Sequence, residues 1–424
     1  MRRFRPVVAA LLTVAVTAAA PAAAADVDFT VRTRIESVID SAASDASATT
    51  SRLRLSADSG WLGGRVRFEL ELDQTLAVDT VDYSTGVVDR GTAVIPDPEV
   101  TEVNRVSIAL RLTDRTTLVL GRQALEFDNE RFVGTLEFRQ NSQSFDALLL
   151  TNSTISNLDL NYAYVDKVHR LFGDDANREF ESEDLRFGTG QTRPGPQLGR
   201  HALDAHLFNA RWSGTDAGIL SVYGYWIDNE DFARFSVDSF GARFVGKVKP
   251  GAIGFHYGLE YAYQVSGASN PVSYHADYYH LTAGLSHGRK RLTFDYEVLG
   301  ADDSAAFITP LGTLHQFQGW TDKFALITPN VGVRDLSLTA SWRRRGFRLR
   351  AVAHRFEADR GSQTIGEELA IELQQSFRDD LYRFNLTYVD YRARVDDNLG
   401  PGGFENDTAK LFATFWVNLF AERQ

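Results

Sequence analysis

The residues of this sequence with the clearest capacity for chemistry are arginines that alternate with apolar side chains. Across 65–73, charged residues occupy the odd positions and apolar residues occupy the even ones. A guanidinium group binds carboxylates through paired hydrogen bonds, and rings of arginine favour anions in channels. The pattern predicts an anion-selective pore lined by Arg32, Arg34, Arg52, Arg54, Arg65, Arg67, Arg105, Arg111, Arg243, Arg348 and Arg350.

Carboxylates that share these positions offer a second interpretation. Glu36, Glu69 and Glu71 follow the same alternation as the arginines. Opposite charges on neighbouring strands stabilise a sheet, so the arginines could simply stiffen the wall. For any single arginine we expect this structural role, whereas the excess of arginine in 27–73 and 103–112 favours a pore.

Other kinds of chemistry find little support. The sequence contains no Cys, which excludes disulfides, thiolate metal sites and a cysteine nucleophile. Its nine His are scattered, and no catalytic or phosphate-binding motif occurs. We therefore predict no catalytic residue, no metal site and no cofactor, and we expect the acidic segments around Asp174, Asp302 and Asp396 to be solvated loops rather than calcium sites. A net charge of −11 gives no support for nucleic-acid binding.

The first 25 residues have the composition of a secretory signal peptide. Three arginines precede an apolar stretch, and alanines at 22–25 precede Asp26. This order of basic, apolar and small residues is typical of a cleaved leader. A membrane anchor is the alternative, but the apolar stretch is short for a spanning helix, which needs ~20 residues. We expect 1–25 to be removed and 26–424 to form a single domain.

The remaining sequence alternates with a period of two, which indicates β-strands. Strands of soluble sandwiches have about five or six residues, whereas about ten cross a bilayer when tilted. Most of the expected strands are near the longer value, so the apolar face should meet lipid and the charged face the lumen. The expected strands are 27–37, 50–58, 63–73, 103–112, 115–122, 143–151, 156–165, 202–212, 218–226, 238–248, 252–264, 277–287, 290–299, 334–343, 346–356, 367–376, 380–391 and 408–420.

The connections between these strands alternate between short and long. Two-residue turns such as 113–114 and 288–289 contrast with long connections such as 74–102 and 166–201. Short periplasmic turns and long extracellular loops are typical of outer-membrane barrels. The sequence therefore predicts an all-β fold, namely a transmembrane antiparallel up-and-down β-barrel of about 18 strands in the bacterial outer membrane.

Two irregular segments lie between strands on the long-loop side, and the one at 307–324 is too apolar for a solvated loop. One interpretation is that they fold into the lumen and narrow the pore. The alternative is that they pack on the rim for stability, and the sequence does not decide between the two. The candidates for a constriction are Arg122, Arg131, Arg139, His315, Asp322 and Lys323.

The same two segments carry a resemblance to a known family. The first reads GRQALEFDNERFVG at 121–134, with FRQN at 138–141 and SFDA at 144–147; the second reads TPLGTLHQFQGWTDKF at 309–324. Both resemble the alginate-export family of outer-membrane barrels, at the level of pattern over most of the chain. The resemblance implies an 18-stranded barrel and, for the founding member, an electropositive pore that passes a polyuronate. The founding member's constriction residues cannot be aligned by motif, so none is transferred.

These observations favour a passive outer-membrane channel for anionic solutes, with an anionic polysaccharide or oligouronate such as alginate as substrate. A nutrient porin for small organic acids or sugars is the first alternative, and a barrel enzyme acting on lipid or glycan is the second. The expected partners are outer-membrane lipid and lipopolysaccharide, the anionic solute and periplasmic export proteins. The direction of transport and the oligomeric state stay open.

Overall fold

The structure is a computed structural model that describes residues 26–79, 82–177, 195–313, 315–324, 328–361, 363–395, 399 and 403–419. The predicted leader at 1–25 lies outside the described residues, as do Leu314, Asp396 and the later acidic residues of the segment around Asp174, namely Glu179, Glu181, Glu183 and Asp184. In the described part of the chain, no helix is long and apolar enough to span a membrane.

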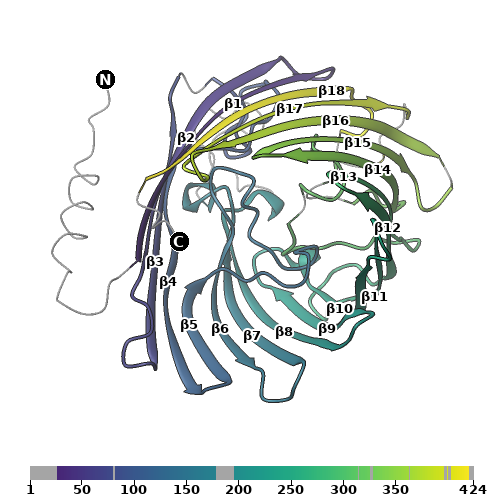
Figure 1. Ribbon diagram of the computed structural model, residues 1–424. Coiled ribbons are helices and arrows are strands. Elements are labelled where there is room, and N and C mark those ends of the chain that lie inside the picture. The colour runs from purple at the N-terminus through teal and green to yellow at the C-terminus, as the bar shows by residue number, and fades with distance from the viewer. Residues whose placement is uncertain are drawn as a thin grey trace.

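Eighteen strands form one closed antiparallel sheet (Figure 1). The strands are β1 (Asp26–Asp40), β2 (Ala46–Asp58), β3 (Val66–Ala77), β4 (Val100–Thr113), β5 (Thr116–Gln123), β6 (Ser144–Asn152), β7 (Leu158–His169), β8 (Arg200–Thr215), β9 (Gly218–Asn229), β10 (Val237–Val248), β11 (Ile253–Ser266), β12 (His275–His287), β13 (Lys290–Leu299), β14 (Val333–Arg344), β15 (Phe347–Glu357), β16 (Thr364–Phe377), β17 (Tyr382–Ala393) and β18 (Thr408–Asn418). The described residues also form three short 3-10 helices, η1 (Asp174–Asn177), η2 (Gly195–Gln197) and η3 (Ala233–Phe235).

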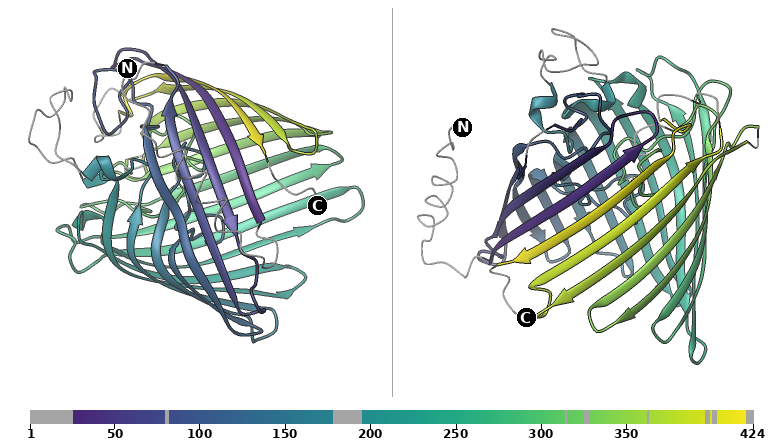
Figure 2. Two further views of the ribbon diagram at one scale, coloured as in Figure 1. Left: turned by 90° about the vertical axis from the view of Figure 1, so that its left-hand side faces the viewer. Right: turned by 90° about the horizontal axis from the view of Figure 1, so that it is seen from above.

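Each strand pairs with its neighbours in the sequence, and β1 closes the barrel against β18. Thr30 lies opposite Asn418, and Asp40 lies opposite Thr408. Closure leaves no free sheet edge, which a membrane-spanning sheet requires because lipid cannot satisfy backbone hydrogen bonds. The structure confirms the predicted fold, and the strand boundaries differ from the expected ones by a few residues. Figure 2 shows the strands tilted across the wall, with the long loops at one rim and the short turns at the other.

Burial along the strands is the reverse of that in a soluble protein. In β1, Ile35 is 50% exposed, whereas Arg34 and Glu36 are each 1% exposed. In β11, the outward rings of Tyr261 and Tyr263 are 45% and 38% exposed. The apolar face of each strand is thus the outer wall that meets lipid, as predicted, and the charged face is internal.

The main apolar core lies inside the barrel, in the half nearest the long loops. Phe307 and Leu311 of the connection between β13 and β14 pack there with Val165, Leu207 and Tyr278 of the wall. All five residues are fully or almost fully buried. The core therefore joins a folded-in connection to the strands around it.

A β-bulge in β4 adds a second polar side chain to the luminal face. Glu71 of β3 pairs with Arg105, but the next residue, Leu72, pairs with Val103, so that Asn104 is an extra residue. Such a bulge breaks the alternation of side chains at one point. Asn104 is accordingly buried, at 3% exposure.

Candidate functional site

Two long connections fold back into the lumen and contact each other (Figure 1). They are residues 124–143, between β5 and β6, and residues 300–332, between β13 and β14; we call their described residues the luminal plug. Val133 forms an isolated parallel bridge with Leu311. The amide of Gly134 donates to the carbonyl of Leu311 at 3.0 Å. The plug therefore unites the two segments that the sequence singled out.

Aromatic packing holds the plug against the wall. The ring of Phe132 lies 5.1 to 6.1 Å, between centroids, from the rings of Tyr223, Tyr225, Tyr278 and Phe307. Burying rings of this size is a large apolar contribution, and edge-on contacts add about 0.5–1.5 kcal/mol each. The plug is thus packed as a protein core and not as a solvated loop.

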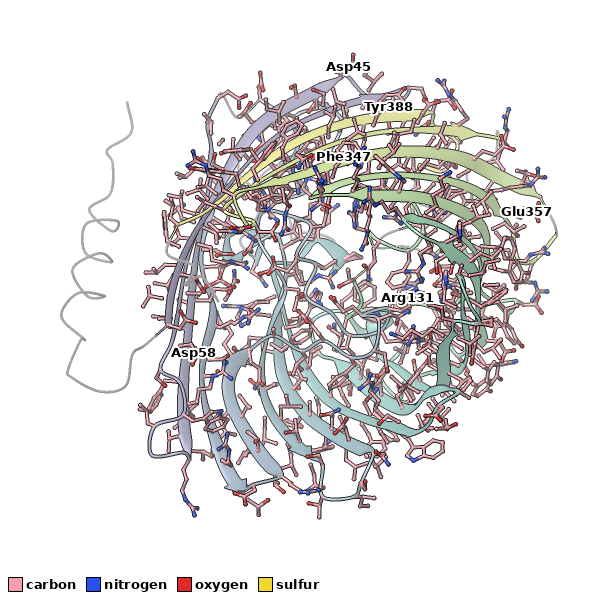
Figure 3. The ribbon with its side chains drawn as sticks, in the orientation of Figure 1. Asp45, Asp58, Arg131, Phe347, Glu357 and Tyr388 are labelled. Atoms are coloured by element: carbon pink, nitrogen blue, oxygen red, sulfur yellow. The ribbon has the colours of Figure 1, made fainter. Side chains whose placement is uncertain are left out.

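Arg131 fixes one end of the plug inside the ring of strands (Figure 3). Its side chain is 1% exposed, and its Nε lies 2.6 Å from the Oε1 of Glu297 on β13. Its Nη1 donates to the Oγ1 of Thr309 at 2.9 Å. One arginine thereby connects both plug segments to the wall, and removing either charge would leave the other buried without a partner.

Asp322 is the centre of a second charged contact. Its carboxylate lies 2.6 Å from Nη2 of Arg139, 2.6 Å from Nδ1 of His315 and 3.4 Å from Nζ of Lys410 on β18. Arg139 also lies 3.0 Å from Glu36 of β1. Three of the predicted constriction residues therefore meet at one point, although Arg139 comes from the first segment and His315 and Asp322 come from the second.

The surroundings of this contact shift two pKa values in the plug. Burial lowers the pKa of His315, although the carboxylate of Asp322 opposes that shift. Burial alone would raise the pKa of Asp322, but His315, Lys410 and Arg139 outweigh it and hold that pKa well below its ordinary value. Asp322 is therefore ionised at neutral pH. The imidazole of His315 lies parallel to the ring of Phe138, 3.5 Å away between centroids.

The two remaining constriction candidates behave differently. Nζ of Lys323 donates to the carbonyl of Gly403 at 2.9 Å and lies 3.5 Å from Asp40, so it ties the plug to the wall. Arg122, by contrast, lies in β5 and not in the mouth of the pore. It is paired across the strands with Val106, which is 52% exposed on the outer face. The prediction that Arg122 contributes to a constriction is therefore corrected: the register turns its side chain outward, towards Asp146.

The plug covers the arginines of β1. Nε of Arg32 donates to Gln140 at 2.8 Å, and its Nη1 donates to the carbonyl of Glu137 at 2.8 Å. Arg34 lies 3.3 Å from Asp97, a residue of the connection between β3 and β4. Both arginines are almost fully buried, at 3% and 1% exposure. They stabilise the plug and do not contact the open lumen.

The arginines of β2 have acidic partners in the plug and in the wall. Arg52 lies 3.1 Å from Glu137, and Arg54 lies 2.8 Å from the same carboxylate. Arg54 also pairs with Asp73 of β3 at 2.6 Å. Burial alone would raise the pKa of Glu137, but Arg54, Arg52 and Arg32 outweigh it and hold that pKa far below its ordinary value. The positive charge beneath the plug is therefore largely neutralised.

Four predicted pore arginines lie in the part of the wall that the plug leaves open, and each has a carboxylate partner. Their side chains are 20% to 35% exposed, so water reaches them. These ion pairs are Arg67 with Asp58 and Glu69, Arg105 with Glu71, Arg243 with Glu260, and Arg348 with Glu372.

The last three predicted pore arginines have no carboxylate within 4.0 Å among the described residues. Arg65 is exposed in the turn before β3. Arg111 lies over the ring of Trp61, 4.1 Å from its centroid. Arg350 lines a cavity of about 260 Å³ between the plug and strands β12 to β15. Phe317 is among the plug residues that line the same cavity.

Sequence reasoning missed several residues that build the site. Glu137 stands directly before FRQN at 138–141, between two quoted parts of the first resemblance segment, and only this neighbourhood could have drawn attention to it. Asp97 lies in a connection without periodicity, and no local signal marks it. Gln140 is fully buried and bridges Arg32 to β2, a contact that depends on the tertiary fold. In the described part of the chain, no group of three or more His, Asp or Glu is placed to hold a metal ion.

Comparison with known proteins places this geometry in a family. The chain is similar in structure to OpdL of Pseudomonas aeruginosa, with 16% identity, a TM-score of 0.66 and coverage of 93% of this chain and 98% of that chain. OpdK of Pseudomonas aeruginosa, solved with vanillate, gives 12% identity, a TM-score of 0.66 and coverage of 93% and 98%. OccAB4 of Acinetobacter baumannii gives 11% identity, a TM-score of 0.67 and coverage of 94% and 99%. Such low identities show the fold alone.

No curated protein sequence matches the chain. The model of the family described as alginate export matches residues 24–398, which is most of the chain. The family and the fold are those of outer-membrane channels. This protein therefore belongs to the alginate export family of bacterial outer-membrane β-barrels.

Proposed function

We propose that this channel passes carboxylate-bearing solutes by passive diffusion, with an anionic polysaccharide or oligouronate such as alginate as the favoured substrate. Family membership supports a polyuronate. The observation that carries the proposal is that Arg111 and Arg350, on the luminal faces of β4 and β15, have no carboxylate within 4.0 Å among the described residues. Unpaired guanidinium groups in a confined lumen raise the local concentration of anions.

Ion selectivity tests this proposal. Planar-bilayer recordings in a KCl gradient should show a reversal potential that favours chloride. The double variant Arg111→Ser with Arg350→Ser should have a chloride-to-potassium permeability ratio about twofold lower, because the substitutions remove two fixed positive charges from the lumen. The matched control is Arg360→Ser with Arg392→Ser, which removes two arginines that are 46% and 56% exposed near the long-loop rim. Cation preference in the unaltered protein would contradict the proposal.

A porin for small organic acids is the second candidate. The plug lies in the long-loop half of the lumen, and the cavity beside Arg350 has only about 260 Å³, a volume that suits a small solute. The similar structure of OpdK was solved with vanillate, a small aromatic carboxylate. Measuring current block by vanillate and by uronate oligomers of increasing length separates the two candidates. Block by vanillate together with no binding of a mannuronate hexamer would favour the second.

A further inference from the structure

Five arginines gather at the short-turn rim, where the turn between β12 and β13 lies beside the turn between β14 and β15. With Gly346, Phe347 and Gln374 they line a pocket of about 390 Å³, which we call the rim pocket. The five arginines are Arg289, Arg343, Arg344, Arg345 and Arg348.

Backbone pairing forces these arginines together. The amide of Arg343 donates to the carbonyl of Arg289 at 3.0 Å, which joins the two turns. Across the hairpin, Arg343 lies directly opposite Arg348. Like charges that face each other on neighbouring strands destabilise a sheet. The positive charges of Arg343 and Arg348 therefore repel each other across this hairpin.

The arginines of the rim pocket have few acidic neighbours. Arg348 is paired with Glu372 of β16. Among the described residues, no carboxylate lies within 4.0 Å of Arg289, Arg343 or Arg345. The same is true of Arg344. These four side chains are exposed. A bound anion would relieve their mutual repulsion, because its charge would lie between them.

The luminal arginines of the rim pocket are continued by a further arginine along the inner face of β15. Arg343 and Arg348 are paired on the luminal face, and Arg350 follows two positions further along β15. Because side chains alternate between the faces of a strand, Arg348 and Arg350 lie on the same face. Arg350 lines the cavity beneath the plug. A row of guanidinium groups thus leads from the rim to that cavity.

We infer that the rim pocket is an anion-binding site at the periplasmic mouth, which binds carboxylates of an anionic oligosaccharide before the chain enters the lumen. The inference rests on the proposed function and adds a location and a direction to it, namely loading from the periplasm. Several guanidinium groups within one pocket bind successive carboxylates of one chain, so the later contacts are intramolecular and strengthen binding. Arg343 and Arg348 face the lumen and not the outer wall, which favours a polymer over a lipid headgroup.

The test is the binding of a mannuronate hexamer to the full chain in detergent, measured by isothermal titration calorimetry. The double variant Arg289→Ser and Arg345→Ser changes only turn positions. It should weaken binding by about tenfold at low salt and by less at high salt, because salt screens exposed charges. The variant Arg289→Lys with Arg345→Lys should retain most of the affinity, because the charge stays. The control, Arg392→Ser with Arg394→Ser on the opposite rim, should leave the affinity unchanged.

The outcomes separate this inference from the proposed function. Unchanged hexamer affinity in the Ser variant, in a channel that still prefers chloride, would overturn the rim site and leave the anion channel standing. A channel without anion preference would overturn the proposed function. Loss of binding to phosphatidylglycerol vesicles with no change in hexamer affinity would assign the pocket to lipid and contradict the inference. Block of the current at lower hexamer concentration from the short-turn side than from the long-loop side would support it.

Discussion

The arginines of this chain have two different kinds of surroundings. Arg34 of β1 is 1% exposed and is held by Asp97 and by the plug. Arg345, in the turn before β15, is exposed and has no carboxylate within 4.0 Å among the described residues. The first kind stabilises the fold, because a buried charge needs a partner. The second kind remains able to attract a solute.

The first prediction concerns Asp322, which contacts Arg139, His315 and Lys410. Asp322→Asn should destabilise the plug by about 3 kcal/mol, because it leaves buried positive charge without its partner. Hydrogen exchange of the amides in 315–324 measures this. Asp303→Asn is the control, since the Asp303 side chain is 89% exposed and its pair with Arg360 contributes little. Unchanged exchange in the Asp322 variant would show that the contact does not hold the plug.

The second prediction is a loss of plug stability on acidification. The pKa values of His315 and Asp322 are both lowered in the folded protein. Because these pKa values are lower in the folded protein than in the unfolded chain, the unfolded chain takes up protons at a higher pH than the folded protein does. The contribution of the two groups to plug stability is therefore complete above their ordinary pKa values and declines as the pH falls. The loss of plug stability should begin below about pH 6.5, where His315 becomes protonated in the unfolded chain, and should continue below about pH 4, where Asp322 does so.

Hydrogen exchange of the plug at several pH values, corrected for intrinsic exchange rates, checks this second prediction. His315→Gln should remove the dependence between about pH 5 and pH 6.5, because glutamine does not titrate. Plug stability that rises on acidification would contradict the expected direction.

The strands are regular, but the connections are what shape the lumen. Strand pairing is local, since each strand pairs with the next along the chain, apart from the closing pair of β1 with β18. The contact between Val133 and Leu311 joins two connections that are far apart in the sequence. This contact requires the backbones of the two connections to lie close together, and Gly312 lies where they meet. A Cβ atom at Gly312 would lie 2.2 Å from the carbonyl oxygen of Arg131.

The third prediction tests this close approach. Gly312→Ala should separate the two plug segments and destabilise their contact by about 1–3 kcal/mol, because backbone atoms cannot move aside easily. Faster hydrogen exchange at 130–136 and a larger single-channel conductance would report the separation. Gly258→Ala is the control, since its Cβ would meet only ordinary contacts at 3.4 Å in β11. A variant with unaltered conductance and exchange would show that the segments tolerate the shift.

The two faces of the barrel wall have different environments: the outer face meets lipid, and the inner face meets water or packed protein. Alternating residues of one strand therefore experience opposite environments. In β14, Leu338 is 48% exposed on the outer wall, whereas Ser337 is buried at 8% on the inner side. Thr339 is half-buried and lines the luminal cavity. Substitutions at adjacent positions should therefore differ in effect.

The fourth prediction compares two neighbouring positions in the middle of β14. Leu338→Arg should destabilise the folded barrel by about 2–4 kcal/mol, because it places a charge in the hydrocarbon region. Thr339→Arg should have a small effect on stability, because its side chain lies in the lumen, and should change ion selectivity instead. Reversible denaturation in lipid vesicles measures the first effect, and bilayer recordings measure the second. Equal destabilisation by both would contradict the assigned faces.

Much of this protein could be read from its sequence. The period of two in the strands and the short turns are local features, so the 18 antiparallel strands, their lipid-facing sides and the outer-membrane location were all predicted. The two resemblance segments were also recognised as unusual. These properties follow from neighbouring residues, whose alternation places them on opposite faces of a strand.

The partners of each charged group came from the fold. Sequence could not tell which arginines would be buried beneath the plug and which would stay accessible, because their partners Asp97, Glu137 and Glu372 stand in other connections and strands. It could not show that Arg122 faces outward or that Asp322 meets Arg139, since these depend on strand register and on two distant connections folding together. Charge is a property of the residue, but its neutralisation depends on what lies within a few ångströms, and that distance is set by closure of the barrel around its plug.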